Sequence, residues 1–356
     1  MTAEAVAGQF ATSGQIAAVR PYGGGHVNDS YLVSTGTGAR YVLQRLNQAA
    51  FRRPDQVMEN IVAVTQHLVA KANGTRQHLT LVRTNQGNWW HTEHDGEVWR
   101  LFEFVPGALE QPGPADMFQV GQAFGQFLID LDDLPITSLH TTIADFHNEL
   151  RYLAKLRATI AADPLGRVAQ VGPEIQDALG YEAISHGFDD PDLMPLRVTH
   201  NDAKVSNILF DANSGQPLCV IDLDTVQPGW AVNDFGDAIR SGASTAPEDE
   251  PDTTKVAFSL ELFQAFTRGY LGACGAVLAP SEIVHLRHGA ALMTLETSLR
   301  FLTDYIEGDI YYRTTRAGQN LDRARNQLTL LADIEANWQS MGTVIDAAMA
   351  NQTAPR

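Results

Sequence analysis

The first hundred residues alternate short apolar runs with glycine-containing turns, a pattern typical of antiparallel strands. One stretch departs from it, because Val57, Ile61, Val64 and Leu68 recur at helical spacing after Pro54, a residue suited to the first turn of a helix. We therefore expect a five-stranded sheet that carries one helix. The predicted strands cover residues 16–22, 30–34, 40–46, 78–84 and 98–104.

Helical periodicity dominates the chain after Val105-Pro106-Gly107. Residues 120–131 carry one apolar stripe, and the pattern predicts an α+β protein with a sheet lobe at 1–105 and a larger, mainly helical lobe at 106–356. The first dozen residues and 353–356 are expected to be loose ends. Further helical stretches are predicted at about 145–186, 252–271, 281–306 and 319–350.

A cluster of polar residues interrupts two apolar runs near the middle of the chain. His200, Asp202 and Asn207 form an H-x-D-x-x-x-x-N pattern, the spacing of the catalytic loop in protein-kinase-like phosphotransferases. The apolar run that follows predicts a buried strand ending at Asp222, with Asp224 on the same face two residues later. The alternative is an ordinary hairpin with solvated acids.

The tripeptide Asp234-Phe235-Gly236 resembles the metal-binding D-F-G of protein kinases. It follows a Pro-Gly turn instead of a buried strand, so we assign the metal role to Asp222. Asp234 and Asp237 are then expected to mark the start of a helix, where the helix dipole favours carboxylates.

A glycine-rich segment between the first two predicted strands suits the approach of a phosphate. Gly23, Gly24 and Gly25 precede Asn28, and glycines allow backbone N–H groups to come close to an anion. A simple turn is the alternative. In a two-lobed arrangement the adenine of a nucleotide would lie against the backbone of Glu103 and Val105, in the cleft between the lobes.

Composition narrows the class of protein. The net charge of −17 disfavours nucleic acid as a partner, and no apolar run reaches the length of a membrane span. The first residues lack the pattern of an export signal, so we expect a cytoplasmic protein. No sequence feature fixes the oligomeric state, for which a monomer is our expectation. Cys219 and Cys274 share no motif with other ligands, which indicates buried thiols without a disulfide or zinc site.

Several longer segments resemble the aminoglycoside phosphotransferase and choline kinase superfamily. Within it they are most similar to sugar kinases that phosphorylate C1 of N-acetylglucosamine and N-acetylgalactosamine. The resemblance implies a two-lobed protein-kinase-like fold and a reaction that uses ATP and Mg²⁺. The segments are PYGGGHVNDSYLV, YVLQRLN, PLRVTHNDAKVSNILFD, VIDLDTVQPG, DFGDAIRSGAST and LRFLTDYIEGDIYY.

The resemblance also implies roles for single residues. Asp202 would be the base that takes the proton of the sugar hydroxyl, and Asn207 and Asp222 would hold magnesium on ATP. The residues implied in sugar binding are His26, Asp202, Asp224, Arg300 and Tyr311.

Arg300 has an alternative role, because it lies four residues from both Glu296 and Asp304. Such an i, i+4 ladder would stabilise an exposed helix face without any contact to a substrate.

Two positions depart from the expected patterns. Gln44 stands where protein kinases carry a phosphate-binding lysine, and Lys204 is our candidate for the missing charge. Ser241 stands where the sugar kinases tend to have an aromatic residue, which implies a wider pocket. Two other functions stay open: an antibiotic kinase, consistent with the acidic charge, and a nucleotide-binding pseudokinase, consistent with Gln44.

Overall fold

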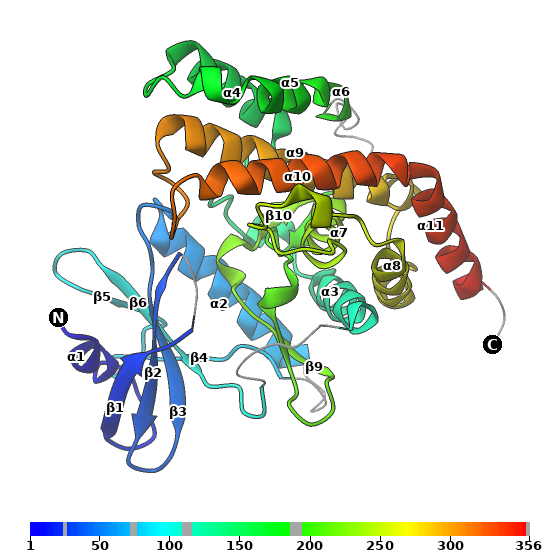
Figure 1. Cartoon of the computed structure of the whole chain (residues 1–356). Helices are drawn as coiled ribbons and strands as arrows, with labels where there is room; N and C mark the ends of the chain where they lie inside the picture. Colours follow the sequence, from blue (N-terminus) through cyan, green and yellow to red (C-terminus); the bar gives the residue numbers. More distant parts are fainter. Residues whose placement is uncertain (24–26, 72–76, 109–115, 186–193, 354–356) are drawn as a thin grey trace. The chain divides into compact units, whose positions relative to one another are not determined.

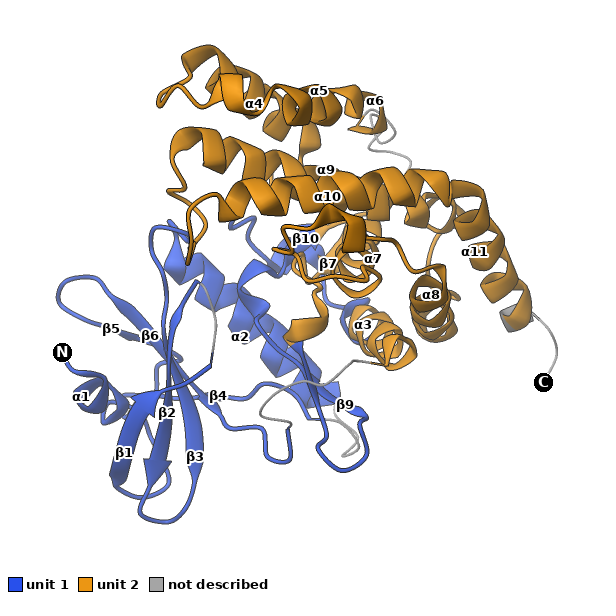
Figure 2. Ribbon diagram, in the orientation of Figure 1, with its two compact units in different colours: residues 1–112, 130–144, 208–228 blue, residues 113–129, 145–207, 229–356 orange. Residues whose placement is uncertain are grey.

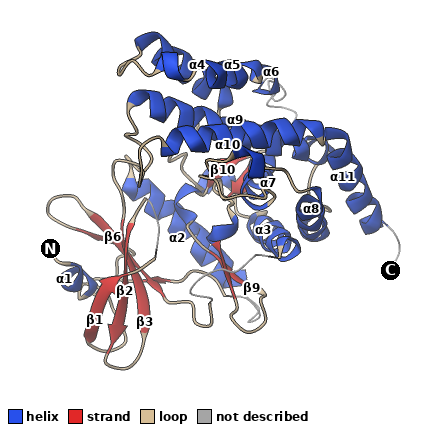
Figure 3. Cartoon of the chain, in the orientation of Figure 1, coloured by secondary structure: helices blue, strands red, loops and turns tan. Residues whose placement is uncertain are grey.

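The computed structural model describes residues 1–23, 27–71, 77–108, 116–185 and 194–353. The chain forms two compact units (Figure 2), each assembled from separate stretches. Unit 1 comprises residues 1–112, 130–144 and 208–228, and unit 2 comprises residues 113–129, 145–207 and 229–356. Strands gather in the N-terminal region and helices in the C-terminal region (Figure 3), which confirms the predicted α+β class.

Unit 1 is built on a six-stranded sheet with the order β1-β2-β3-β6-β4, in which β5 also pairs with β6. The expected five strands are present, but the fourth covers only Leu81–Val82 of the predicted residues 78–84. A sixth, β5, is two residues long and was not predicted. The pairings are antiparallel. The strands are β1 (Ile16–Pro21), β2 (Asp29–Thr35), β3 (Arg40–Arg45), β4 (Leu81–Val82), β5 (His91–Thr92) and β6 (Val98–Glu103).

The N-terminal residues are ordered, against the expectation of a loose end. Residues Ala3–Ala7 form helix α1, capped by the Thr2 side chain. Val6 and Phe10 are almost fully buried and join a core that includes Leu43 of the sheet. A single helical turn gives too short a periodicity to be recognised, so the packing of these apolar side chains decides the structure.

The predicted helix of unit 1 is confirmed as α2 (Pro54–Lys71), and the four side chains of its apolar stripe are buried. The remaining elements of unit 1 come from later parts of the chain. They are the 3₁₀ turn η1 (Ile136–Ser138), the antiparallel hairpin of β8 (Ile208–Phe210) and β9 (Pro217–Val220), and the 3₁₀ turn η6 (Leu223–Thr225).

Unit 2 is mainly helical, and within it α9 and α10 run side by side (Figure 1). Two predicted helical stretches are divided. The stretch predicted at 145–186 breaks after α4, where Asp163 has a left-handed backbone. The stretch predicted at 319–350 is interrupted at Asn337. The helices are α3 (Met117–Leu131), whose last two residues belong to unit 1, α4 (Glu149–Ala162), α5 (Gly172–Gly180), α6 (Glu182–Ser185), α7 (Ala231–Gly242), α8 (Leu260–Cys274), α9 (Pro280–Glu307), α10 (Gln319–Ala336) and α11 (Trp338–Thr353).

Shorter elements connect these helices. They are η2 (Val168–Gln170), β7 (Arg197–Thr199), η5 (Val205–Asn207), β10 (Gln227–Gly229), which begins in unit 1, and η7 (Thr253–Lys255). In the part of the chain that the structure describes, no helix combines the length and apolar character needed to cross a membrane. Both cysteines are buried as predicted, and burial raises the pKa of each thiol to about 12.

Helices α7 and α9 approach so closely that only glycine fits at their contact. A Cβ atom at Gly236 would lie 2.2 Å from the carbonyl oxygen of Gly289, and one at Gly289 would lie 2.0 Å from that of Val232. Phe235 is fully buried, with its ring edge-to-face against Phe263. The D-F-G look-alike therefore lies inside a helix, where Phe235 and Gly236 serve the packing of α7.

We expect Gly289→Ala to lower the free energy of unfolding by roughly 1–3 kcal/mol, because the new methyl group collides with rigid backbone. Urea unfolding followed by circular dichroism measures the change. Gly272→Ala is the matched control: this helical glycine has open space around it, so alanine should stabilise the protein by about 0.5–1 kcal/mol. Equal effects at both positions would contradict the close contact.

Candidate active site

The predicted catalytic loop follows β7 in unit 2 and is anchored by its histidine. The ring of His200 is fully buried, with centroids 5.8 Å from Phe124 and 5.7 Å from Phe127 of α3. The next residue, Asn201, has a left-handed backbone with φ of 60°. This sharp turn ends the strand, and Asp202 is the first residue after it.

The Asp202 carboxylate contacts one amide and one ammonium group of its own loop. The side-chain amide of Asn207 donates to one carboxylate oxygen at 3.0 Å, and the Lys204 ammonium lies 2.7 Å from the other. Burial opposes ionisation of this carboxyl, but Lys204 and Asn207 outweigh it and lower the pKa of Asp202. The structure thus brings together three predicted site residues around an ionised carboxylate.

A buried carboxylate of α7 holds the backbone just before Asp202. The N–H groups of His200 and Asn201 donate to the two oxygens of Asp234 at 2.8 and 2.7 Å. Asp234 does lie in the first turn of a helix, as predicted, but its side chain reaches the catalytic loop instead of the helix end. Sequence reasoning missed this role, because an acid in the first turn of a helix is already explained by the helix dipole.

His147 holds the same turn from its other side. One ring nitrogen is 2.9 Å from the carbonyl oxygen of Asn201, and the other is 3.0 Å from the carboxylate of Glu296 on α9. Both nitrogens face acceptors, so the ring donates from both nitrogens and is the positively charged imidazolium. Burial alone would lower its pKa, but the charge of Glu296 raises the pKa of His147 to about 9.

Arg300 continues this network toward the predicted sugar site. Its guanidinium lies 3.2 Å from Glu296, which is fully buried, so one of the two expected i, i+4 pairs is present. The second is absent, because Asp304 accepts backbone N–H groups of the following loop, including that of Tyr311. The helix face is also buried and not exposed as that alternative required.

Aromatic rings surround the Arg300 guanidinium. Its central carbon lies 5.9 Å from the ring centre of Tyr311, whose side chain is largely exposed. Two predicted sugar-binding residues are therefore neighbours in unit 2, while His26 lies outside the described residues. The other rings at 5.5–5.9 Å are those of Phe146, Tyr152 and Tyr312.

The remaining predicted site residues belong to unit 1. Gly23 has a left-handed backbone with φ of 78°, and Gly24 and Gly25 lie outside the described residues. Glu103 is exposed at the end of β6, and Val105 is buried.

The expectation that Asp222 and Asp224 share one face of a strand is wrong. Strand β9 ends at Val220, Asp222 has a left-handed backbone with φ of 61°, and a 3₁₀ turn follows. Asp222 is exposed, whereas Asp224 is 3% exposed. Strand alternation does not apply beyond the end of the strand, so the two carboxylates have different surroundings.

The Asp224 side chain binds other side chains of unit 1. Its carboxylate pairs with the buried guanidinium of Arg100 and accepts from the side-chain amide of Asn28. Arg100 also donates to the side-chain oxygen of Gln44. Ser241, the other departure noted in the sequence, is exposed and donates to the carbonyl oxygen of Asp237 in its own helix.

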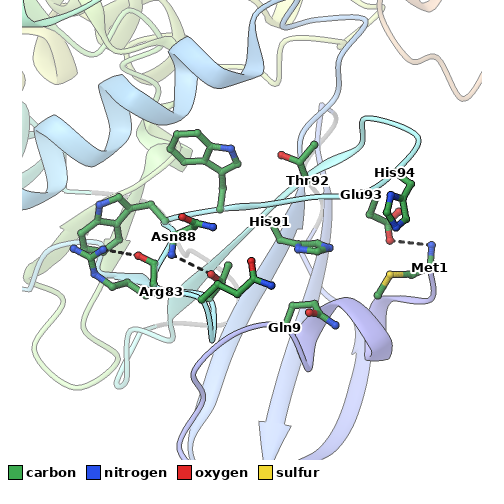
Figure 4. A pocket seen from close by; sticks show the side chains of 13 residues that line it. Met1, Gln9, Arg83, Asn88, His91, Thr92, Glu93 and His94 are labelled. Carbon is green, nitrogen blue, oxygen red and sulfur yellow. Dashed lines mark hydrogen bonds and ion pairs between the residues drawn. The ribbon is translucent and has the colours of Figure 1, made fainter.

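A hollow of about 790 Å³ lies elsewhere in unit 1, between the end of α1 and the β4–β5 connection (Figure 4). Met1, Gln9, Arg83, His91 and Glu93 are among its lining residues. None of the predicted site residues lines it, so we do not assign it to the chemistry.

The buried His147 predicts how stability varies with pH. A histidine whose pKa is raised by folding, here from 6.5 to about 9, stabilises the protein fully below pH 6.5 and loses this effect as pH rises through 9. His147→Gln should therefore cost roughly 3 kcal/mol of unfolding free energy at pH 6, and less at each higher pH up to 9.5. Urea unfolding across this range measures the difference.

His140→Gln is the matched control, because His140 forms an exposed pair with Glu59. It should change the unfolding free energy by less than about 1 kcal/mol at every pH. A cost of His147→Gln that stays constant from pH 6 to 9.5 would contradict a proton held by Glu296.

Comparison with known proteins places this chain in a family. Residues 18–274, more than half of the chain, match the model of the phosphotransferase enzyme family, APH. Among solved structures, a microcompartment-associated aminopropanol kinase has 17% identity and a TM-score of 0.61, covering 96% of this chain and 98% of that chain. The amicoumacin kinase hAmiN, in complex with AMP-PNP, Ca²⁺ and Ami, has 14% identity and a TM-score of 0.60, covering 93% and 91%.

An aminoglycoside phosphotransferase from Alicyclobacillus acidocaldarius subsp. acidocaldarius DSM 446 is similar to the same degree. It has 14% identity and a TM-score of 0.61, covering 98% of this chain and 97% of that chain. At these identities the likeness shows the fold, and it confirms the predicted kinase-like architecture. The match along residues 18–274 goes further than the fold: the chain belongs to the phosphotransferase enzyme family.

Proposed function

We propose that this phosphotransferase transfers the terminal phosphoryl group of ATP to a hydroxyl group of a small molecule, with Asp202 as the base. The observation that carries the proposal is the ionised Asp202 carboxylate, held by Asn207 and Lys204 directly after a clamped turn. A positioned carboxylate of this kind accepts a proton from a hydroxyl group within hydrogen-bond reach.

The proposed reaction needs little covalent chemistry from the protein. The substrate hydroxyl gives its proton to Asp202, its oxygen bonds to the terminal phosphorus, and the bond from that phosphorus to the bridging oxygen breaks to release ADP. Most of the rate gain then comes from the position and charge of the groups around the phosphates.

Asn207 and Asp222 are the proposed protein ligands of magnesium, which would neutralise charge on the phosphates. The side-chain nitrogen of Asn207 is committed to Asp202, which leaves its amide oxygen as the atom for a metal. Amide and carboxylate oxygens suit this hard cation. The described residues hold no group of three or more His, Cys, Asp or Glu suited to a metal, which fits an ion held mainly by phosphate and water.

The nucleotide is proposed to lie against unit 1. Gly23, Gly24, Gly25 and Asn28 would face the phosphates, and the backbone of Glu103 and Val105 would face the adenine. The left-handed backbone at Gly23 supports this assignment, because it turns N–H groups in a way that other residues rarely allow.

For the acceptor we propose an N-acetylhexosamine phosphorylated at C1. The neighbouring Arg300 and Tyr311 support this choice, since a planar guanidinium and an exposed ring suit the hydroxyl and acetamido groups of a sugar. His26 is proposed as a further sugar contact. Asp224, the other residue implied by the resemblance, is buried with its carboxylate bound to Arg100 and Asn28, so we do not propose it as a sugar contact.

An amine-bearing acceptor is the second candidate. The similar solved structures include an aminopropanol kinase and an aminoglycoside phosphotransferase. Arg300 would repel such a cationic substrate only weakly, because the negative charge of Glu296 offsets its positive charge. The net charge of −17 would also favour a cation.

The purified protein should be incubated with ATP and magnesium, together with N-acetylglucosamine, N-acetylgalactosamine, kanamycin or aminopropanol. ADP release shows turnover, and phosphorus NMR locates the new phosphate. We expect an anomeric phosphate on a hexosamine. Turnover with kanamycin or aminopropanol but with neither sugar would show an amine-bearing acceptor in place of the proposed hexosamine. Nucleotide binding without turnover on any acceptor would favour a pseudokinase.

Asp202→Asn should fold as the wild type does and lose at least ~100-fold in kcat on the accepted substrate, because the amide cannot take the proton. Thermal unfolding checks the fold, and ADP release measures the rate. Retained activity would assign the base to another residue.

Lys204→Ala tests the second charge of the loop. We propose that Lys204 steadies Asp202 and adds positive charge near the transferred phosphoryl group. Its loss should lower kcat by roughly tenfold or more, the range of a lost electrostatic contact in an active site. Unchanged kcat and KM for ATP would remove Lys204 from the site.

A further inference from the structure

Gln44 and Arg100 are paired opposite each other on neighbouring strands of unit 1. In the antiparallel register of β3 and β6, Gln44 is the partner of Arg100. The side-chain oxygen of Gln44 accepts two hydrogen bonds from the guanidinium, at 3.0 Å from Nε and 2.8 Å from Nη2. The neutral position 44 is therefore in direct contact with a full positive charge.

This guanidinium is almost completely buried, with 1% of Arg100 exposed. A buried cation is unfavourable without an opposite charge, and Asp224, itself 3% exposed, supplies it. The second oxygen of Asp224 accepts from the Asn28 side chain, which in turn accepts the backbone N–H of Asn47. One charge thus fixes β3, β6, the start of β2 and the turn after Asp222.

The contrast with protein kinases lies in where the cation and its carboxylate come from. There a lysine on the strand equivalent to β3 pairs with the phosphates and with a helix glutamate. Here β3 offers Gln44, and Glu59 of α2 pairs with His140 instead. The cation stands on the neighbouring strand, and its carboxylate lies two residues after Asp222.

We propose that Arg100 is the positioning residue of the nucleotide site and takes the place of the lysine that position 44 lacks. It acts through Asp224 and Gln44, and sets the segments that carry Asn28 and Asp222 for a nucleoside triphosphate. The inference rests on the proposed function, because it assumes that unit 1 takes ATP.

Arg100→Gln removes the charge and leaves a side chain that still forms hydrogen bonds. Isothermal titration should show a Kd for ATP raised by about tenfold or more, the scale of a lost charge-assisted contact. In steady-state assays KM for ATP should rise far more than KM for the acceptor. Because Asp224 would be left buried without its partner, Arg100→Gln combined with Asp224→Asn provides a neutral variant should the single variant fail to fold.

Moving the charge back provides the decisive variant. Gln44→Lys in the Arg100→Gln background restores a cation at the paired position, and it should recover most of the ATP affinity. Arg45→Gln is the matched control, because Arg45 lies next to Gln44 on β3 and forms a pair with Asp29 in which both side chains are exposed. Its Kd should change by less than about twofold.

The outcomes separate this inference from the function on which it rests. If the wild type binds no ATP, the proposed function is wrong and the inference falls with it. If the wild type binds ATP and both the Arg100→Gln and the neutral double variant bind equally well, Arg100 only stabilises the fold and this inference alone is overturned. Failure of Gln44→Lys to restore affinity would also overturn it.

Discussion

The position of Asp202 depends on one buried carboxylate, that of Asp234. It takes both backbone N–H groups that precede Asp202 and so fixes a left-handed turn at Asn201. Backbone groups buried in such a turn need partners, and a carboxylate provides two acceptors at once. Helix α7 carries Asp234, so the place of this helix decides where the proposed base stands.

The packing of α7 on α9 supports the catalytic turn from two directions. Gly236 and Gly289 allow the two backbones to touch, which sets α7 and with it Asp234. Helix α9 also supplies Glu296, whose charge keeps the proton on His147 and so maintains the hydrogen bond to the Asn201 carbonyl. A substrate that contacts Arg300 would thus touch a residue linked to the catalytic turn through Glu296 and His147.

Periodicity and motif spacing predicted what depends on neighbouring residues in the chain. Helix α2, its apolar stripe and the contact of Asp202 with Asn207 belong to this group. His147 contacts Asn201, 54 positions away, and Arg100 pairs with Asp224, 124 positions away. No local sequence pattern predicts contacts over such distances in the chain. Helix α1 and strand β5 were missed because they are short and owe their structure to packing.

The interleaving of the two units along the chain has a consequence for synthesis. Unit 1 begins at residue 1 but needs residues 208–228, so the ribosome must translate most of unit 2's first half before unit 1 has all its parts. Unit 1 can therefore complete its fold only after residue 228, when two of the three stretches of unit 2 have already been made. No single proteolytic cut or truncation point yields either unit intact, and shuffling one unit between related enzymes would require several junctions.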